Sequence, residues 1–134
     1  MELSLSSSLP VALITGSSSG IGSAIAARLA SEGFLALINS RSENDGARKT
    51  LEAIRSAGHQ AEFATGDLSK VSEIKRGFQE IRERYGRIDV LVNNAGICPF
   101  HEWDEVTEEV WDQTHSTNLK AGYFCTKARP RDRT

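Results

Sequence analysis

The stretch VALITGSSSGIG, residues 11–22, joins a short apolar run to a loop that carries three glycines. A short and nearly continuous apolar run is typical of a strand that is covered on both faces. In the loop, Gly16 allows a tight turn, Gly20 lets the backbone approach a phosphate, and Gly22 permits close packing of a helix. The first N–H groups of that helix would favour an anion. The stretch therefore predicts a strand, a phosphate-binding loop and a helix, although a plain serine-rich turn remains the alternative.

Three further apolar runs follow along the chain: FLALIN at 34–39, AEFAT at 61–65 and IDVLVN at 88–93. The segments between them have helical period, with apolar residues at Ile21, Ile25 and Leu29, at Ala47, Leu51 and Ile54, and at Val71, Ile74, Phe78, Ile81 and Tyr85. Strands that alternate with helices of this length indicate right-handed βαβ units and a parallel sheet. The pattern predicts the α/β class.

One long helix is expected near the end of the chain, from about residue 108 to 127. Thr107 is a suitable N-cap, and Glu108 and Glu109 would lie at the positive end of the helix dipole.

Four motifs occur in order: TGSSSGIG at 15–22, GDLS at 66–69, NNAG at 93–96, and Asn118 within STNLKAGYF. With these motifs, residues 9–128 resemble the N-terminal, cofactor-binding part of the short-chain dehydrogenase/reductase family. The resemblance implies a Rossmann-like, doubly wound parallel sheet, here incomplete, with about four strands in the order 3-2-1-4 and flanking helices. It also implies one NAD(P)-binding domain at 1–128, followed by an aberrant basic tail at 129–134.

The resemblance carries residue roles with it. Asp67 and Leu68 are expected to hold the adenine, and Asn93 to stabilise the central strands near the adenosine ribose. The same residue types also cap loops and turns, which is the alternative reading. The whole implied cofactor site consists of Gly16, Ser18, Ser19, Gly20, Ile21, Gly22, Ser40, Arg41, Asp67, Leu68, Asn93, Ala95 and Gly96.

The choice of cofactor is expected to depend on NSRS, residues 39–42, at the end of the second apolar run. An acidic residue there would bind both ribose hydroxyls of NAD and repel a 2′-phosphate. Ser40 occupies that position and Arg41 follows it, so a hydroxyl and a guanidinium suited to phosphate are present instead. NADP is favoured over NAD. The alternative is that Arg41 is a solvated loop residue. NADP-using relatives often have a basic residue at the position of Ser19, so the preference for NADP depends mainly on Arg41.

Catalysis in the family uses an asparagine in a proton relay, which Asn118 matches, together with a serine and a Tyr-x-x-x-Lys pair further along. Tyr123 and Lys127 have that spacing, but they lie on the helix predicted to carry Asn118 and are not expected to be the catalytic pair. We therefore expect a fragment of an oxidoreductase acting on a carbonyl or alcohol substrate, inactive by itself. The alternative is a shortened, non-catalytic isoform that binds NADP or competes for a partner's dimer surface.

Composition argues against other classes of function. Lys and Arg total 16 against 18 Asp and Glu, so the net charge is −2 and no field attracts nucleic acid. No apolar segment reaches membrane-spanning length, which favours a cytoplasmic protein without a membrane partner. Cys98 and Cys125 lack the spacing of metal ligands, and no metal is expected. Without a fifth strand beside residues 88–92, an exposed sheet edge is expected to favour homo-oligomers or other association.

Overall fold

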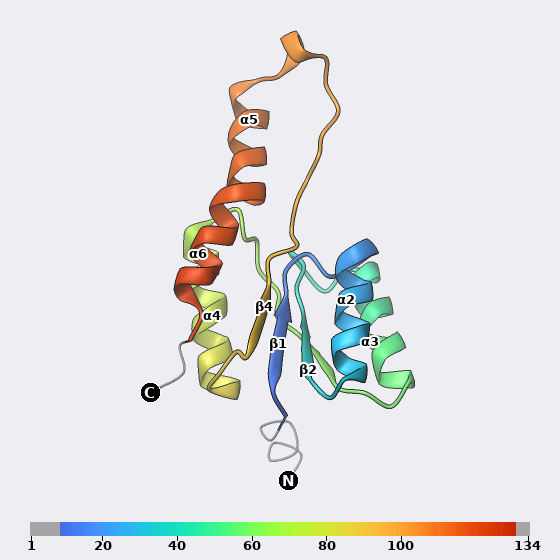
Figure 1. Ribbon diagram of the computed structural model, residues 1–134. Helices are drawn as coiled ribbons and strands as arrows, with labels where there is room; N and C mark the ends of the chain where they lie inside the picture. The colour runs from blue at the N-terminus through green and yellow to red at the C-terminus, as the bar shows by residue number, and fades with distance from the viewer. Residues whose placement is uncertain (1–8, 131–134) are drawn as a thin grey trace.

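The fold is built on a four-stranded parallel sheet with strands in the order β3-β2-β1-β4 (Figure 1). The computed structural model describes residues 9–130. The strands are β1 (Val11–Ile14), β2 (Leu35–Ile38), β3 (Ala61–Phe63) and β4 (Val90–Val92). Each of them falls within one of the four predicted apolar runs. The Rossmann-like α/β fold and its strand order are therefore confirmed.

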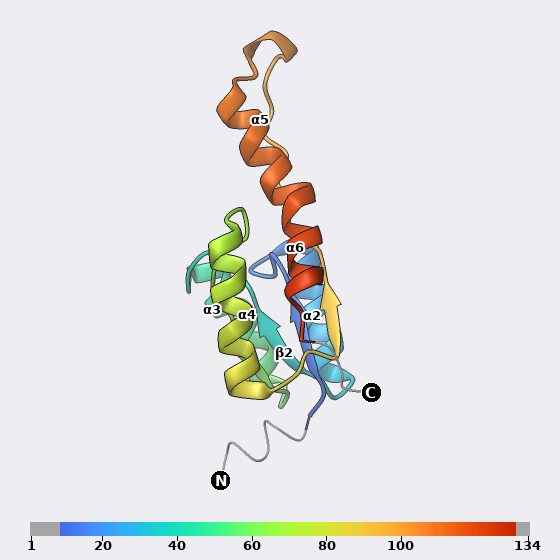
Figure 2. The same cartoon turned by 90° about the vertical axis from the view of Figure 1, so that its left-hand side faces the viewer.

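Helices cover both faces of the sheet, as Figures 1 and 2 show. The helices α2 (Gly20–Ser31) and α3 (Asp45–Ser56) lie on one face, and α4 (Val71–Tyr85) and α6 (Ala121–Ala128) lie on the other. Because successive strand residues point to opposite faces, β1 and β2 supply both cores from one apolar run each. All eight residues of these two strands are buried, as a sheet covered on both sides requires.

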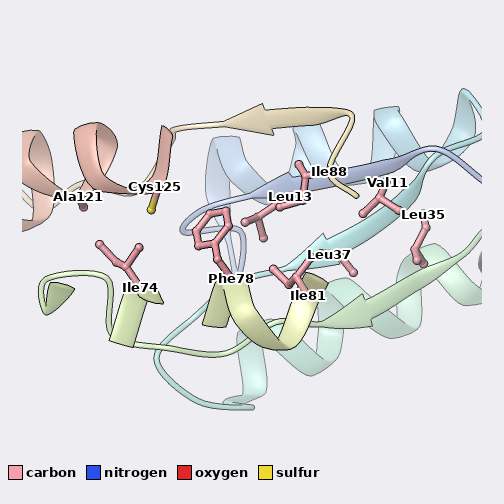
Figure 3. Packing of buried hydrophobic residues seen from close by; sticks show 10 residues of the cluster. All are labelled: Val11, Leu13, Leu35, Leu37, Ile74, Phe78, Ile81, Ile88, Ala121 and Cys125. Atoms are coloured by element: carbon pink, nitrogen blue, oxygen red, sulfur yellow. The ribbon is translucent and has the colours of Figure 1, made fainter. Parts of the chain in front are cut away.

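The core on the α4 side is made of large aliphatic and aromatic side chains (Figure 3). Leu13 and Leu37 of the sheet pack there with Ile74 and Phe78 of α4, and Ala121 and Cys125 of α6 join the same cluster. The core on the other face contains more alanine, which brings α2 close to the sheet. The loop at residues 15–19 connects the end of β1 to the start of α2.

The prediction that Ile21 begins the buried face of α2 is wrong. The buried residues of this helix are Gly22, Ala26 and Ala30, whereas Ile21 is 75% exposed. Ile25 and Leu29 pack only partly against the core. Small residues form the contact face because a larger side chain at Gly22 would overlap the glycine loop, so the buried stripe is displaced by one position.

The predicted helix at 108–127 is present, with an internal change of geometry. It comprises α5 (Glu108–His115), a π-helical turn at Ser116–Lys120, and α6. Helical backbone angles continue across both junctions. Thr107 caps α5, since its hydroxyl oxygen accepts from the N–H of Val110 at 3.2 Å. Together with the preceding loop and a short 3-10 turn (Trp103–Glu105), α5 projects beyond the sheet (Figure 2).

Two predicted segments fall wholly or partly outside the described range. The serine-rich leader at 1–8 lies outside it, as do residues 131–134 of the predicted tail. The described part of the tail begins where α6 ends: the N–H of Arg129 donates to the carbonyl of Cys125 at 3.0 Å, and the chain then turns extended.

Candidate functional site

A cleft of about 470 Å³ opens at the carboxyl end of the sheet. In parallel α/β sheets this is the edge where loops from neighbouring strands meet and ligands bind. Most of the predicted cofactor residues line it: Gly16, Ser18, Ser19, Ile21, Ser40, Arg41, Asp67, Leu68, Ala95 and Gly96. Gly20, Gly22 and Asn93 are not among its lining residues. The fold therefore brings the ends of all four strands to one hollow.

Each glycine of the first loop is required, or tolerated, for a different geometric reason. Gly16 has a left-handed backbone, with φ of 62°, and a Cβ there would lie 2.8 Å from the Cα of Ala95. A Cβ at Gly22 would lie 2.5 Å from the carbonyl oxygen of Gly16 and 2.5 Å from the side-chain nitrogen of Asn94. Gly20 also has a positive φ, of 59°, but its missing side chain would meet open space. The tight turn and the close packing predicted for Gly16 and Gly22 are confirmed.

Five successive backbone N–H groups in this loop are free to bind a ligand. Within residues 9–130, the N–H groups of residues 18–22 donate no hydrogen bond, whereas Gly16 and Ser17 before them and Ser23 after them do. Ser19, the N-cap of α2, makes no capping bond through its side chain. An uncapped helix N-terminus beside a cleft, with its dipole positive there, is suited to an anion such as a phosphate.

The glycine loop is held against the segment after β4 by Thr15 and Asn94, whose roles the sequence did not suggest. The hydroxyl oxygen of Thr15 accepts from the N–H groups of Asn94 and Ala95, both at 2.9 Å. In return, the Asn94 amide donates to the carbonyls of Thr15 and Gly16, both at 3.1 Å. The order of the motifs was the available signal: TG and NNAG lie far apart in sequence but follow adjacent strands.

Ser40 and Arg41 differ in what they can offer a ligand. Ser40 is buried, and its hydroxyl donates to the carbonyl of Ser42, which closes a turn in the loop after β2. Arg41 is exposed on the cleft wall and donates no hydrogen bond within the described part of the chain. The guanidinium is therefore the group free to reach a ligand, while the Ser40 hydroxyl is used locally.

Asp67 remains ionised more readily than an isolated carboxyl group. Burial opposes its ionisation, but hydrogen bonds from the hydroxyl and N–H of Ser69, at 2.7 and 3.0 Å, together with the charges of Arg41 and Lys70, hold the pKa of Asp67 below its usual value. Arg41 and Asp67 thus place opposite charges on the wall of one cleft. A carboxylate oxygen that is not used by Ser69 can accept from a ligand N–H or hydroxyl.

Asn118 lies in the π-helical turn, beside the cleft and outside its lining. Its side-chain oxygen accepts from the N–H of Ile97 and its amide nitrogen donates to the carbonyl of Ile97, both at 2.7 Å. Asn118 also borders a second cavity, of about 270 Å³, with Trp111 and His115 on its wall. π-Helical turns are rare in proteins, but those that occur are often found at functional sites. Nothing in the sequence indicated this turn.

Asn93 connects the sheet to the last helix, since its amide donates to the hydroxyl of Thr126 on α6 at 3.1 Å. Tyr123 and Lys127 lie apart from the cleft: the Tyr123 ring is 64% exposed, and the Lys127 ammonium lies 5.8 Å from the centre of the Phe124 ring. The pair does not line the cleft that the predicted cofactor residues form.

Cys98 is exposed and Cys125 is buried, and both are free thiols. Across residues 9–130, no group of three or more His, Cys, Asp or Glu side chains is placed to hold a metal ion. Nor does any helix in that range combine the length and apolar character needed to cross a bilayer.

Known proteins share both the sequence pattern and the fold. A family model described as short chain dehydrogenase matches residues 10–131. The chain is 38% identical over 114 residues to the hydroxynaphthalene reductase-like protein Arp2 of Metarhizium guizhouense, which covers 85% of this chain and 43% of that protein. The chain thus spans less than half the length of this curated relative.

Two solved structures are similar over nearly the whole chain. A metagenomic short-chain oxidoreductase in complex with NADP superposes with a TM-score of 0.85 at 36% identity, covering 90% of this chain and 54% of that one. A variant of the actinorhodin polyketide ketoreductase with NADPH superposes with a TM-score of 0.83 at 41% identity, covering 91% and 46%.

Proposed function

Because the chain belongs to the short-chain dehydrogenase family, we propose that the cleft at the carboxyl end of its sheet binds NADP. The corresponding full-length protein would transfer hydride between the nicotinamide and the carbon of a carbonyl or hydroxyl group. The observation that carries the proposal is the run of free N–H groups at residues 18–22, in a loop whose Ser18, Ser19 and Ile21 line the cleft together with other predicted cofactor residues.

The site offers a separate group to each part of the dinucleotide. The N–H groups of the glycine loop would bind the pyrophosphate, and Asp67 and Leu68 would hold the adenine. Arg41 would bind the 2′-phosphate that distinguishes NADP from NAD, since its guanidinium is exposed on the cleft wall. The complexes of the two solved relatives with NADP and NADPH support this choice.

Asn118 would act through its backbone and its place in the π-helical turn, because both ends of its side chain are bonded to Ile97. We propose that residues 1–134 alone bind the cofactor without turning over a substrate. Tyr123 is exposed, and neither it nor Tyr85 lines the cleft, so residues 9–130 place no phenol beside the proposed cofactor site to act as general acid.

The first test is NADP and NAD binding by the 134-residue chain, measured by titration calorimetry. We expect tighter binding of NADP, and we expect R41A to weaken NADP binding by about 10-fold or more while leaving NAD binding within about 2-fold, since one charge-assisted contact is lost. R28A is the matched control, because Arg28 is an exposed arginine near the far end of α2 that pairs with Glu32 at 2.9 Å. An unchanged NADP to NAD ratio in R41A would contradict the assignment of Arg41.

A second measurement addresses turnover. We expect no NADPH oxidation by this chain with a panel of ketones and quinones, and no change in Y123F. Turnover that disappears in Y123F would show that Tyr123 acts as the acid and that the proposed lack of activity is wrong.

A further inference from the structure

One asparagine of the cleft, Asn39, has hydrogen bonds that the proposed cofactor roles leave unexplained. It follows β2 and is only 5% exposed. Its side-chain oxygen accepts from the N–H of Gly16 at 3.0 Å, and its side-chain nitrogen donates to the carbonyl of Ala64 at 3.0 Å. Gly16 belongs to the glycine loop, and Ala64 begins the segment that leads to Asp67. The side chain therefore bridges two walls of the cleft.

The backbone of Asn39 fixes the same loop a second time. The N–H of Ser17 donates to the Asn39 carbonyl, and the N–H of Asn39 donates to the Ser17 hydroxyl, both at 2.9 Å. The Ser17 hydroxyl in turn donates to the carbonyl of Ile14 at 2.7 Å. With its backbone held in this way, the Asn39 carboxamide has little freedom to rotate away from its two partners.

A carboxamide serves both partners, and an ionised carboxylate of the same shape does not. The N–H of Gly16 requires an acceptor, and the carbonyl of Ala64 requires a donor. An aspartate has nearly the same shape, but its carboxylate only accepts, so it would face the Ala64 carbonyl without a proton between them. A leucine would leave both backbone groups unpaired.

In residues 9–130, no other side chain makes hydrogen bonds to both the glycine loop and the segment after β3. These two segments carry the proposed phosphate contacts and the proposed adenine contacts, respectively. Asn39 occupies the N–H of Gly16 with its side chain and the N–H of Ser17 with its carbonyl, so the free N–H groups of the loop begin at Ser18. The Asn39 side chain thus adds a direct link between the free N–H groups and the segment that leads to Asp67, beside the backbone bonds of Ser17 and Gly66.

We propose that Asn39 is a positioning residue that couples the glycine loop to the adenine side of the cleft and so sets the spacing that a dinucleotide must match. This inference rests on the proposed NADP site. It assigns no contact with the cofactor to Asn39, whose effect reaches the ligand through Gly16 and Ala64.

The test is N39D, with NADP affinity measured on the 134-residue chain from pH 8 to pH 5.5. At pH 8 the carboxylate cannot donate to Ala64, and we expect NADP to bind about 10-fold or more weakly than to the unaltered chain. A carboxyl group facing a carbonyl in a buried site favours its protonated form. Once protonated, it both donates and accepts as the carboxamide does, so we expect the deficit to shrink to about 3-fold or less at pH 5.5. Comparison at each pH cancels the titration of the cofactor's own 2′-phosphate.

N44D is the matched control for charge. Asn44 lines the same cleft, but its side chain accepts from the N–H of Ala47 at 2.8 Å and donates no hydrogen bond within residues 9–130. An aspartate serves equally well as this N-cap, so N44D adds the same charge and breaks no bond. We expect its ratio to the unaltered chain to stay constant from pH 8 to pH 5.5.

Each outcome decides between the claims. A deficit in N39D that recovers at low pH, with none of this recovery in N44D, supports the inference. N39D binding as tightly as the unaltered chain at pH 8, or a deficit without recovery, overturns the inference alone. Failure of the unaltered chain to bind NADP overturns the proposed function and the inference together. If N39D is unfolded at pH 8 by circular dichroism, N39S replaces it: a hydroxyl cannot span both partners, and full affinity in N39S overturns the inference.

Discussion

The absence of a side chain at Gly22 allows the glycine loop, α2 and the segment after β4 to pack closely together. In G22A the added methyl group would lie 2.5 Å from two atoms, of which the carbonyl oxygen of Gly16 belongs to the backbone and cannot swing away. We expect G22A to lower the free energy of unfolding by about 1–3 kcal/mol through this overlap, and to weaken NADP binding. Urea unfolding followed by circular dichroism measures the first effect.

G20A is the comparison for that experiment. Gly20 has a positive φ, but an added methyl group meets nothing within 4 Å. We therefore expect G20A to cost only the backbone strain, on the order of 1–2 kcal/mol. A loss in G20A that clearly exceeds the loss in G22A would show that packing at Gly22 is not the tighter constraint.

Asp89 links pH to stability at the start of the sheet. Partial burial opposes its ionisation, but Arg87 at 2.8 Å and the N–H of Val11 at 2.6 Å hold the pKa of Asp89 below its usual value. A carboxyl group with a lowered folded-state pKa stabilises the fold above its unfolded-state pKa, and this contribution disappears as the pH falls through the folded value. We expect D89N to lower the melting temperature by a few degrees at pH 7.

The difference between D89N and the unaltered chain should shrink progressively below about pH 4, where the carboxyl group becomes protonated. Thermal melts recorded from pH 7 to pH 3 measure it. A difference that stays constant across this range would mean that the charge of Asp89 contributes nothing and that only its shape matters.

At the scale of elements, α5 and α6 form one continuous helix but are supported unequally. Ala121 and Cys125 of α6 are buried against α4, whereas no residue of α5 is buried. We expect backbone amides of α6 to exchange with solvent more slowly than those of α5, by about 10-fold or more, because local opening of α5 exposes little new surface. Amide exchange followed by mass spectrometry resolves the two peptides. Equal protection across residues 108–128 would contradict this expectation.

Local chemistry allowed most elements to be predicted. The four apolar runs, the cap at Thr107 and the glycine spacing each act within a few residues, so their sequence is sufficient. Local chemistry did not predict the exposure of the Ile21 side chain, the bridge made by Asn39 or the π-helical turn around Asn118. Each depends on a partner from a distant part of the chain: Asn94 beside Gly22, Ala64 beside Asn39, and Ile97 beside Asn118.

At the scale of the whole molecule, β4 forms an open edge of the sheet. Within residues 9–130, β4 pairs only with β1, and all three of its residues are only partly buried. Trp111 of α5 and Leu119 of the π-helical turn are exposed, and Phe124 of α6 is partly buried. An unpaired sheet edge is a template for association, and exposed large apolar side chains favour it further.

We expect the apparent mass of this chain, measured by light scattering, to rise above that of a monomer as its concentration increases. Higher salt should strengthen the association or leave it unchanged, since the surface is apolar and screening affects only charges. A single monomeric species at all concentrations, with a cooperative melt, would show that β4 and the projecting helix are stable without a partner.

The π-helical turn at Ser116–Lys120 also sets how α5 is rotated about the helix axis relative to α6. One residue in an α-helix corresponds to a rotation of about 100°, so deleting a single residue from this turn would rotate α5 by about that angle relative to α6, because α6 is held against α4 and no residue of α5 is buried. Trp111 and His115 of α5 would then turn away from the wall of the second cavity that they form with Asn118. The lining of this cavity thus depends on chain length at one turn as well as on the identity of its side chains.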